Sequence, residues 1–526
     1  MRKENQRLRT SARKSQPGQA KTCPRAHIRL ACASFLFLFP SAALAATPVD
    51  GIKVDEIKVD WNKVEQVSKT TPTLQVVVNP MLRRGSPIHD QSFQALKNLQ
   101  ADYVRFVPWY PYPKLGVAEL EPPTADRTSW DFSLIDPLVL DFLDATAGHS
   151  VVLNFSTIPQ WMFKTDQPVA YPADANEVSW SYEQGTEFRD ASLKEVSDYY
   201  ARLVSWYTLG GFTDEIGRRH DSGHHFKVDY LEVLNEPEYE HAISPQTYAR
   251  VYDAVVAAVL KVNPQMKFLG MSLATPSRSP EFFEYFLDPK NHQPGIPLDA
   301  ISYHFYAVPS ADQTPDIHPY TFFEQADHFI DTVRYVESIR RRLSPQTITM
   351  LNEVGSIRSD DIGPASPDAA GIPASYWSLS AAVYAYVYAQ LAHLGIEVIG
   401  ESQLVGYPTQ FPSVTMIDWS TGQPNARYWV LSLLREHFGP GDKLMATSLG
   451  TPSLYAQAFV THGGKRTILV VNRRNHTATF SLAGSAGAHI QVVDASTALG
   501  PPSSADLKTD EVTLSGLAVA VITFGP

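Results

Sequence analysis

The sequence predicts an α/β protein, a (β/α)8 TIM barrel followed by a C-terminal all-β sandwich domain. From Pro72 onward, eight short apolar runs alternate with eight stretches of helical periodicity over about 370 residues, which is typical of an eight-stranded barrel with enlarged loops. After Gly439-Pro-Gly441 the helical stretches stop, and short strand-like runs follow, separated by Gly, Pro, Ser and Asn. A chain of 526 residues with 44% hydrophobic content is long enough for a barrel and a smaller module.

The barrel elements are assigned from apolar runs and from helical periodicity. The eight predicted strands are Leu74–Val78, Tyr103–Val107, Val151–Phe155, Tyr230–Leu234, Phe268–Gly270, Ala300–His304, Thr347–Leu351 and Glu397–Ile399. The predicted helices are Gln91–Leu99, Leu134–Ala147, Ala191–Thr208, Pro245–Val262, Pro280–Leu287, Phe322–Arg342, Ala374–Leu394 and Tyr428–Phe438. A doubly wound open sheet is the alternative, but it needs fewer strands and usually a glycine-rich phosphate turn, which does not follow the first strand.

Domain boundaries follow from the change in pattern. The catalytic barrel is predicted over residues 72–440 and the sandwich over 441–526. The predicted strands of the sandwich are Leu454–Thr461, Arg466–Asn472, Ala478–Leu482, His489–Val493, Val512–Leu514 and Ala518–Phe524. An isolated segment, Ile52–Trp61, also alternates, so we expect residues 46–71 to add a strand to the sandwich.

Residues 1–45 have the pattern of a signal peptide. Nine Lys and Arg residues precede or border an apolar stretch that ends in Ala43-Leu44-Ala45, a small-residue cleavage pattern. Cys23 and Cys32 both lie in this segment, so the mature chain is expected to have no disulfide and no thiolate metal site. We therefore expect a secreted or periplasmic protein.

The charge of the mature chain limits its partners. Removing residues 1–45 takes away nine of the 44 basic and one of the 55 acidic residues, which leaves a formal net charge of −19. Such a surface repels nucleic acid and anionic membranes. We expect neither as a partner of the mature form, and the sequence does not indicate an oligomeric state.

Two glutamates follow apolar runs in the same sequence context. Leu234-Asn-Glu236 ends the predicted fourth strand, and Leu351-Asn-Glu353 ends the seventh. A barrel places its chemistry where its parallel strands end. Two facing carboxylates there suit cleavage of a glycosidic bond, one as acid and then base, the other as nucleophile. Glu236 would begin protonated, whereas Glu353 must be ionised, and a cation such as Arg105 favours the ionised form.

This arrangement resembles clan A of the glycoside hydrolases, the retaining barrel enzymes. In that clan, an Asn-Glu-Pro after strand four carries the acid/base, and a Glu after strand seven is the nucleophile. Here these are Asn235-Glu236-Pro237 and Glu353. The resemblance covers the barrel, about two thirds of the chain, and implies a glycosidase without a cofactor or a metal that acts on an oligosaccharide or glycoside.

Further positions match the clan's pattern. The resemblance implies supporting or substrate-binding roles for Asn235, Arg105, Trp161, His304 and Tyr306, with Asn235 donating to the sugar 2-hydroxyl. The appended sandwich makes the chain most similar to glycoside hydrolase family 39, the β-xylosidases and iduronidases. Families 30 and 79 share the layout and stay open. Long loops after strands two, three and seven favour a closed pocket and exo action on plant or microbial oligosaccharides, with endo action or an inactive binding barrel as alternatives.

Several other residues compete for these roles. Glu401 follows the eighth strand, and Glu238 and Glu240 are expected to be substrate contacts or solvated charges. Two further groups are left open: Trp109, Tyr110 and Tyr112 as loop anchors or sugar platforms, and His220, His224 and His225 as a polar loop or, with His304, a metal-dependent hydrolase site. The histidine spacing fits no zinc pattern.

Overall fold

The computed structural model describes residues 55–525, except 166, 168, 169, 181, 183, 184 and 363–370. The predicted signal peptide, both cysteines and part of the loop after the seventh barrel strand therefore lie outside the described residues. Among the described residues, no helix combines the length and the apolar character that crossing a membrane requires.

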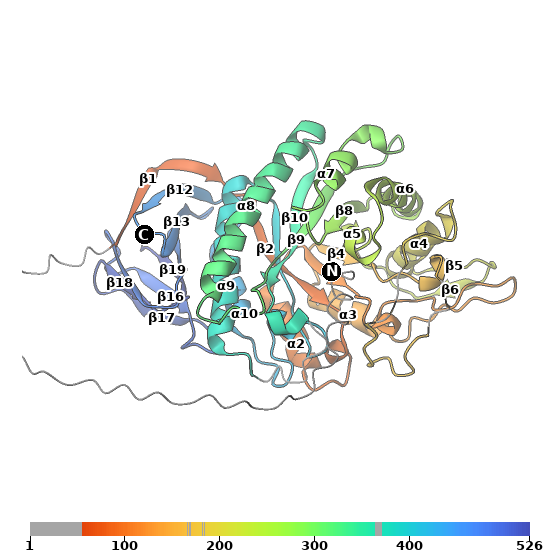
Figure 1. Ribbon diagram of the computed structural model, residues 1–526, viewed down its shortest axis with the longest axis horizontal. Coiled ribbons are helices and arrows are strands. Elements are labelled where there is room, and N and C mark those ends of the chain that lie inside the picture. Colours follow the sequence, from red (N-terminus) through yellow and green to blue (C-terminus); the bar gives the residue numbers. More distant parts are fainter. Residues whose placement is uncertain are drawn as a thin grey trace, which may run out of the picture. The chain divides into compact units, whose positions relative to one another are not determined.

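Eight parallel strands close into a barrel (Figure 1), as predicted. They are β2 (Thr71–Val77), β3 (Val104–Val107), β4 (Val151–Asn154), β7 (Tyr230–Glu232), β8 (Lys267–Leu273), β9 (Ala300–Ala307), β10 (Ile348–Ser356) and β11 (Val398–Glu401). Each strand is almost wholly buried because the surrounding helices cover its outer face.

The helices follow the strands in alternation. They are α2 (His89–Leu99), α3 (Asp136–Ala145), α4 (Lys194–Thr208), α5 (Pro237–Glu240), α6 (Pro245–Val262), α7 (Pro280–Phe286), α8 (His318–Leu343), α9 (Ala374–Leu394) and α10 (Ala426–His437). Local signals fix several ends. The Ser244 side chain caps α6 ahead of Pro245, and Gly395, with φ of +75°, ends α9.

The barrel interior is layered. An apolar layer fills the end of the barrel near the amino termini of its strands. It consists of Val152, Tyr230, Leu269, Ala300, Met350 and Val398. Residues two positions apart on a strand face the same side. The next interior layer therefore contains Asn154, Glu232, Ser302 and Asn352, all buried, and this polar layer lies beneath the carboxyl ends of the strands.

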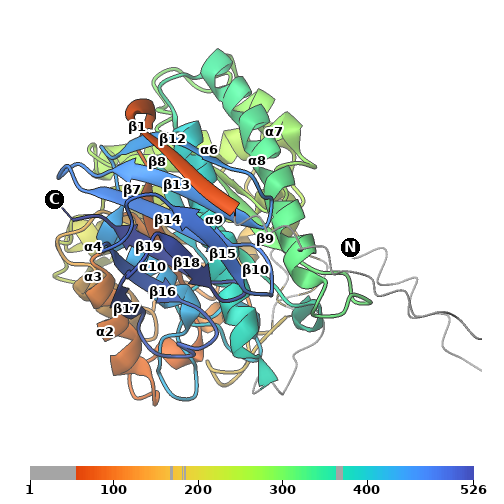
Figure 2. The ribbon, with the colours of Figure 1, turned by 90° about the vertical axis from the view of Figure 1, so that its left-hand side faces the viewer.

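The C-terminal domain is one nine-stranded sheet (Figure 2), in the order β17-β16-β19-β14-β13-β12-β1-β15-β18. Its strands are β1 (Asp55–Val67), β12 (Lys443–Leu449), β13 (Leu454–Val460), β14 (Arg466–Asn472), β15 (Ala478–Leu482), β16 (His489–Val493), β17 (Ser503–Asp506), β18 (Glu511–Leu514) and β19 (Val519–Thr523). Phe480 and Val512, near one end of the strand order, share a core cluster with Ile468 and Ile522, so the sheet curls over a single core.

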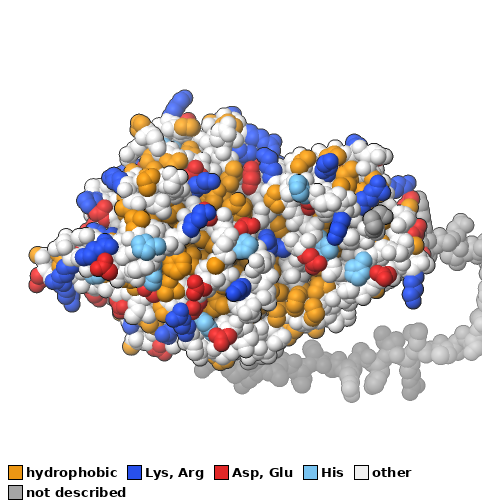
Figure 3. Space-filling model, turned by 180° about the vertical axis from the view of Figure 1, so that it is seen from behind, with side chains coloured by type: hydrophobic (Ala, Val, Ile, Leu, Met, Phe, Trp, Pro, Cys, Tyr) orange, Lys and Arg blue, Asp and Glu red, His pale blue; other side chains and the backbone are white. Residues whose placement is uncertain are grey.

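Several details of this domain differ from the prediction. β12 and β17 were not predicted. β1 pairs with β15 in parallel, whereas its other neighbour, β12, is antiparallel to it. β17 is exposed along its whole length, so it has no apolar alternation by which to recognise it. The face of the sheet formed by β14 and β19 packs on α9, which explains why that helix is buried almost all round. Basic and acidic side chains lie interspersed over the face drawn in Figure 3.

Candidate active site

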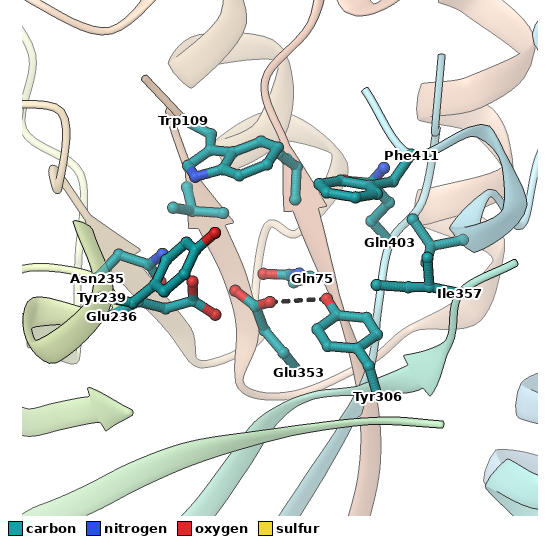
Figure 4. Close-up of a pocket in the computed structure, with 13 residues that line it drawn as sticks. Gln75, Trp109, Asn235, Glu236, Tyr239, Tyr306, Glu353, Ile357, Gln403 and Phe411 are labelled. Atoms are coloured by element: carbon teal, nitrogen blue, oxygen red, sulfur yellow. Dashed lines mark hydrogen bonds between the residues drawn. The ribbon is translucent and has the colours of Figure 1, made fainter. Parts of the chain in front are cut away.

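The two predicted glutamates face each other at the carboxyl ends of the fourth and seventh barrel strands (Figure 4). Glu236 comes just after β7 and precedes α5, while Glu353 lies within β10. Their side chains are 15% and 10% exposed. One carboxylate oxygen of each lies within 4.8 Å of the other. Both acids can therefore reach one atom of a small ligand.

Irregular backbone directs these side chains inward. Leu234 and Glu236 have φ angles of +61° and +42°, a region that costs free energy for residues other than glycine and is concentrated at functional sites. In β10 the ladder register shifts between Met350 and Glu353, as at a β-bulge. Asn352 and Glu353 therefore both point into the barrel, although they are adjacent in the chain.

Arg105 links the polar layer to the site. Its side chain, only 1% exposed, offers five N–H donors. Their partners are Glu232 (Nε to Oε2, 2.6 Å), Gln75 (Nη1 to Oε1, 2.6 Å), Glu353 (Nη1 to Oε1, 2.6 Å), Asn235 (Nη2 to Oδ1, 2.6 Å) and Ser272 (Nη2 to Oγ, 3.1 Å). The guanidinium therefore fixes the nucleophile candidate and the asparagine before Glu236 in one rigid network.

Glu353 is held as an anion. Burial raises the pKa of its carboxyl group, but the cations of His304 and Arg105 and the hydrogen bond from Tyr306 outweigh burial, so its pKa lies below the usual range. Tyr306 donates to Oε2 over 2.7 Å and Arg105 to Oε1. Both oxygens accept hydrogen bonds, which fits a carboxylate kept ionised and oriented.

His304 joins the two glutamates. Its Nδ1 lies 2.8 Å from Oε1 of Glu236 and 3.5 Å from Oε2 of Glu353. On the other side of the ring, Nε2 lies 3.0 Å from Oγ of Ser272. Burial lowers the pKa of His304, but the charge of Glu353 and the hydrogen bond with Glu236 outweigh burial, so its pKa lies above the usual range. The ring is therefore cationic in mildly acidic solution.

The glutamates line a pocket with an aromatic wall. The volume that the centres of water-sized molecules can occupy in this pocket is about 150 Å³. This is roughly ten times the volume that a single water needs on the same measure. Its lining consists of Gln75, Val77, Val107, Trp109, Asn235, Glu236, Tyr239, Tyr306, Glu353, Ile357, Gln403, Phe411 and Val414. Trp109 and Phe411 stack with ring centres 5.6 Å apart. The pocket can hold a small ligand against a π face.

Six of the seven predicted site residues meet here, in the pocket or in the network behind it: Glu236, Glu353, Asn235, Arg105, His304 and Tyr306. Trp161 is the exception, because it is not among the described residues that line the pocket. Its Nε1 donates to the Glu119 carbonyl over 2.9 Å, and the Arg189 guanidinium covers its ring. It holds loops together instead of contacting the pocket.

The competing acids have structural partners. Glu240 accepts hydrogen bonds from Asn235 and Trp109, and Glu238 accepts one from the Thr275 backbone N–H. Both residues are half-buried, and the expectation that they are substrate contacts or solvated charges stays a prediction. Glu401 pairs with the buried Arg427 (2.9 Å) and is itself fully buried.

The aromatic and histidine groups that the sequence left open are also placed. Trp109 lines the pocket, whereas Tyr112 is buried and its hydroxyl bonds to Thr409. His220 pairs with Asp214, and His224 with Asp136. These histidines are structural partners of carboxylates.

Sequence reasoning missed three residues of the network: Gln75, Glu232 and Ser272. Glu232 is fully buried within the run Tyr230-Leu-Glu-Val-Leu234. A carboxylate inside an apolar strand was the available signal, because such a group persists only when it is paired.

A metal ion is a chemical alternative for part of the site. Within the described residues, Glu236, His304 and Glu353 have the spacing of a possible ligand set. In this structure the His304 nitrogen nearest to the acids bonds to Glu236 instead, and the Arg105 cation lies 2.6 Å from Glu353. A fixed cation there opposes a second one, so the geometry favours carboxylate chemistry.

Comparison with known proteins gives a structural likeness only. No protein-family model and no curated protein matches the sequence. The structure is similar to a GH51 arabinofuranosidase from Xanthomonas axonopodis pv. citri (TM-score 0.62, 12% identity, covering 90% of this chain and all of that one). A glucosidase from Croceicoccus marinus is also similar, with a TM-score of 0.56 and 17% identity over 89% of this chain and 98% of that one. So is a GH30 endoxylanase from Clostridium papyrosolvens, with a TM-score of 0.52 and 14% identity over 90% of this chain and all of that one. The likeness establishes the fold, a (β/α)8 barrel with a C-terminal β domain.

Proposed function

We propose that this protein is a retaining glycoside hydrolase of clan A type that cleaves β-type glycosidic bonds. The observation that carries the proposal is the pair Glu236 and Glu353, at the ends of barrel strands four and seven, with oxygens within 4.8 Å of each other. Retaining enzymes hold their carboxyl groups about 5–5.5 Å apart, and inverting enzymes about 6.5–9.5 Å.

The proposed mechanism has two steps. An oxygen of Glu353 attacks the anomeric carbon while Glu236 gives its proton to the leaving oxygen, so the glycosidic C–O bond breaks and an ester forms. Water then attacks the same carbon, gives its proton to Glu236, and restores the Glu353 carboxylate. Asn235 has a second amide N–H beside the one bonded to Glu240, and this group donates to the sugar 2-hydroxyl.

The proposal extends to an exo-acting, β-xylosidase-like enzyme that is secreted or periplasmic. The aromatic wall of Trp109 and Phe411 and the small pocket volume support exo action. Several similar structures are named as arabinofuranosidases or as a xylanase, so pentosides belong in the first substrate panel. The leader pattern of residues 1–45 supports export.

A panel of nitrophenyl glycosides tests the activity, with proton NMR of the first product to establish retention. The panel contains β-xylosides, β-glucosides and α-arabinofuranosides, each assayed with and without a chelator. Absence of hydrolysis across the panel and on oligosaccharides contradicts the proposal, and loss of activity with chelator supports the metal-dependent alternative.

Two variants test the roles. Glu353→Ala should nearly abolish turnover, because no anion remains to trap the anomeric carbon. Glu236→Ala should accumulate the glycosyl-enzyme from a nitrophenyl glycoside, and azide should restore turnover as a β-glycosyl azide, since acid–base assistance is worth about 10²–10⁴-fold. If azide instead rescues only Glu353→Ala and the product has the inverted configuration, the acid/base and nucleophile roles of the two glutamates are exchanged.

A further inference from the structure

We infer that Glu232 is a positioning residue that acts through Arg105: it is the permanent counter-ion of this buried cation while Glu353 is esterified. The inference rests on the proposed function. Glu232 does not line the pocket, and its effect on the reaction passes through the guanidinium.

The contacts of Glu232 identify it as an anion. Oε2 accepts from Arg105 Nε (2.6 Å) and Asn154 Nδ2 (2.7 Å). Oε1 accepts from Ser302 Oγ (2.5 Å) and Asn352 Nδ2 (2.6 Å). Four barrel strands, β3, β4, β9 and β10, supply these donors, and the residue is fully buried. Four donors to one carboxyl group fit a charged acceptor.

The charge balance explains why the site needs this residue. In the free enzyme, Arg105 lies between two carboxylates, so the group of three carries a charge of −1. When Glu353 becomes an ester, its charge is lost and the group becomes neutral. Without Glu232 the same step would convert a neutral pair into an uncompensated buried cation, which is strongly unfavourable. Glu232 therefore favours formation of the glycosyl-enzyme.

Other titratable groups face this cluster. Tyr200 on α4 and Tyr248 on α6 lie close enough to Glu232 to interact with its charge. The Tyr200 hydroxyl accepts from the backbone N–H of Leu234, and the Tyr248 hydroxyl donates to the carbonyl of Val233. His304 and Glu236 lie beyond Glu353 and bond to each other. Within the described residues, Arg105 is the cation in direct contact with Glu232.

The principal test is Glu232→Gln with a substrate whose second step limits turnover, such as a dinitrophenyl glycoside. We expect kcat/KM to fall by about 10²-fold or more, by analogy with broken buried ion pairs. kcat should change much less, because hydrolysis of the ester restores the Glu353 anion beside Arg105. The acid limb of kcat/KM should move to lower pH, because removing a nearby anion favours the ionised form of Glu353.

Glu337→Gln is the matched control. Glu337 is 3% exposed, pairs with Arg340 (2.7 Å) and accepts from Thr349, and it contacts no pocket residue in the described structure. The same substitution there should lower stability and leave the acid limb and the ratio of kcat to kcat/KM unchanged.

A second variant decides the matter if Glu232→Gln does not fold. Ser302→Ala removes one neutral donor from Glu232 and keeps its charge, so the repulsion on Glu353 grows and the acid limb should move to higher pH. The inference is overturned if the acid limb of Ser302→Ala stays at the wild-type position. It is also overturned if Glu232→Gln behaves like Glu337→Gln. A wild-type enzyme that hydrolyses no glycoside overturns the proposed function instead.

Discussion

Replacing His304 with asparagine removes the cation between the two glutamates and keeps an N–H near the position of Nδ1. In the wild-type protein this nitrogen lies 3.5 Å from Glu353. The pKa of His304 is raised, so the ring is charged at any pH low enough to protonate Glu353. The charge stabilises the Glu353 carboxylate, and its loss should raise the pKa of that group.

The size of the effect follows from the distance. Two unit charges 3.5 Å apart at an effective dielectric constant of 20 attract each other by about 5 kcal/mol, which corresponds to roughly three and a half pKa units. Water that enters the altered site and the remaining Arg105 charge reduce this upper limit. We expect the acid limb of kcat/KM to move upward by about one to two pH units in His304→Asn.

The assay is kcat/KM against pH for a glycoside that the wild-type enzyme cleaves, because this parameter reports the free enzyme's ionisations. His292→Asn is the matched control, since His292 is a buried histidine that bonds to Asp253 over 2.6 Å. His292→Asn should keep the wild-type acid limb. An acid limb that stays in place or moves to lower pH in His304→Asn refutes the assignment of that limb to a Glu353 stabilised by His304.

Three further predictions concern single side chains. Tyr306→Phe removes a hydrogen bond to Glu353 worth about 1.5–3 kcal/mol, so the acid limb should rise by about one to two units; an unmoved limb contradicts this. Tyr239 is 58% exposed beside Glu236, where it can stack on the leaving sugar of a disaccharide. Tyr239→Ala should therefore lower kcat/KM for disaccharides about 3- to 10-fold and leave kcat/KM for glycosyl fluorides unchanged, because fluoride has no ring to stack. Equal losses for both substrates count against a leaving-group contact. Burial and the nearby Glu215 raise the pKa of Glu119 to about 8. The folded state thus holds a proton that the unfolded chain releases near pH 4.5, and wild-type stability should fall by roughly 3–5 kcal/mol between pH 5 and pH 8. Urea unfolding of Glu119→Gln should lack this fall, and a parallel fall in both proteins contradicts it.

The barrel could be predicted because its strands are buried on both faces. Burial requires uninterrupted apolar runs, and these stand out between amphipathic helices. Short exposed strands give no such signal. The hairpin of β5 (Gly211–Thr213) and β6 (Arg219–Asp221) was not predicted, and four of the six residues in its strands are exposed or half-buried.

The site was predictable only in part, because strand order brings together residues that are far apart in sequence. Strand order and the two Leu-Asn-Glu motifs placed Glu236 and Glu353, and the resemblance supplied Arg105 and His304. The apolar run around Glu232 signals its burial, but its four donors come from β3, β4, β9 and β10, and no local pattern encodes how these strands are placed around the barrel. Trp161 lies outside the pocket lining: the sequence Pro159-Gln160-Trp161 after the third strand fixes the residue type but not the direction of the side chain.

The repetition of Leu-Asn-Glu has a structural explanation in the polar layer. Asn235 accepts a hydrogen bond from Arg105, and Asn352 donates one to Glu232. An amide group offers both functions, so one residue type serves the cation in one strand and the anion in the other. Adjacent residues of a regular strand face opposite sides. The positive φ angle of Leu234 and the register shift in β10 let each asparagine and the following glutamate face inward together. The two motifs therefore attach both carboxylates to the same buried ion pair, and that shared attachment keeps the pair at the separation that the proposed chemistry requires.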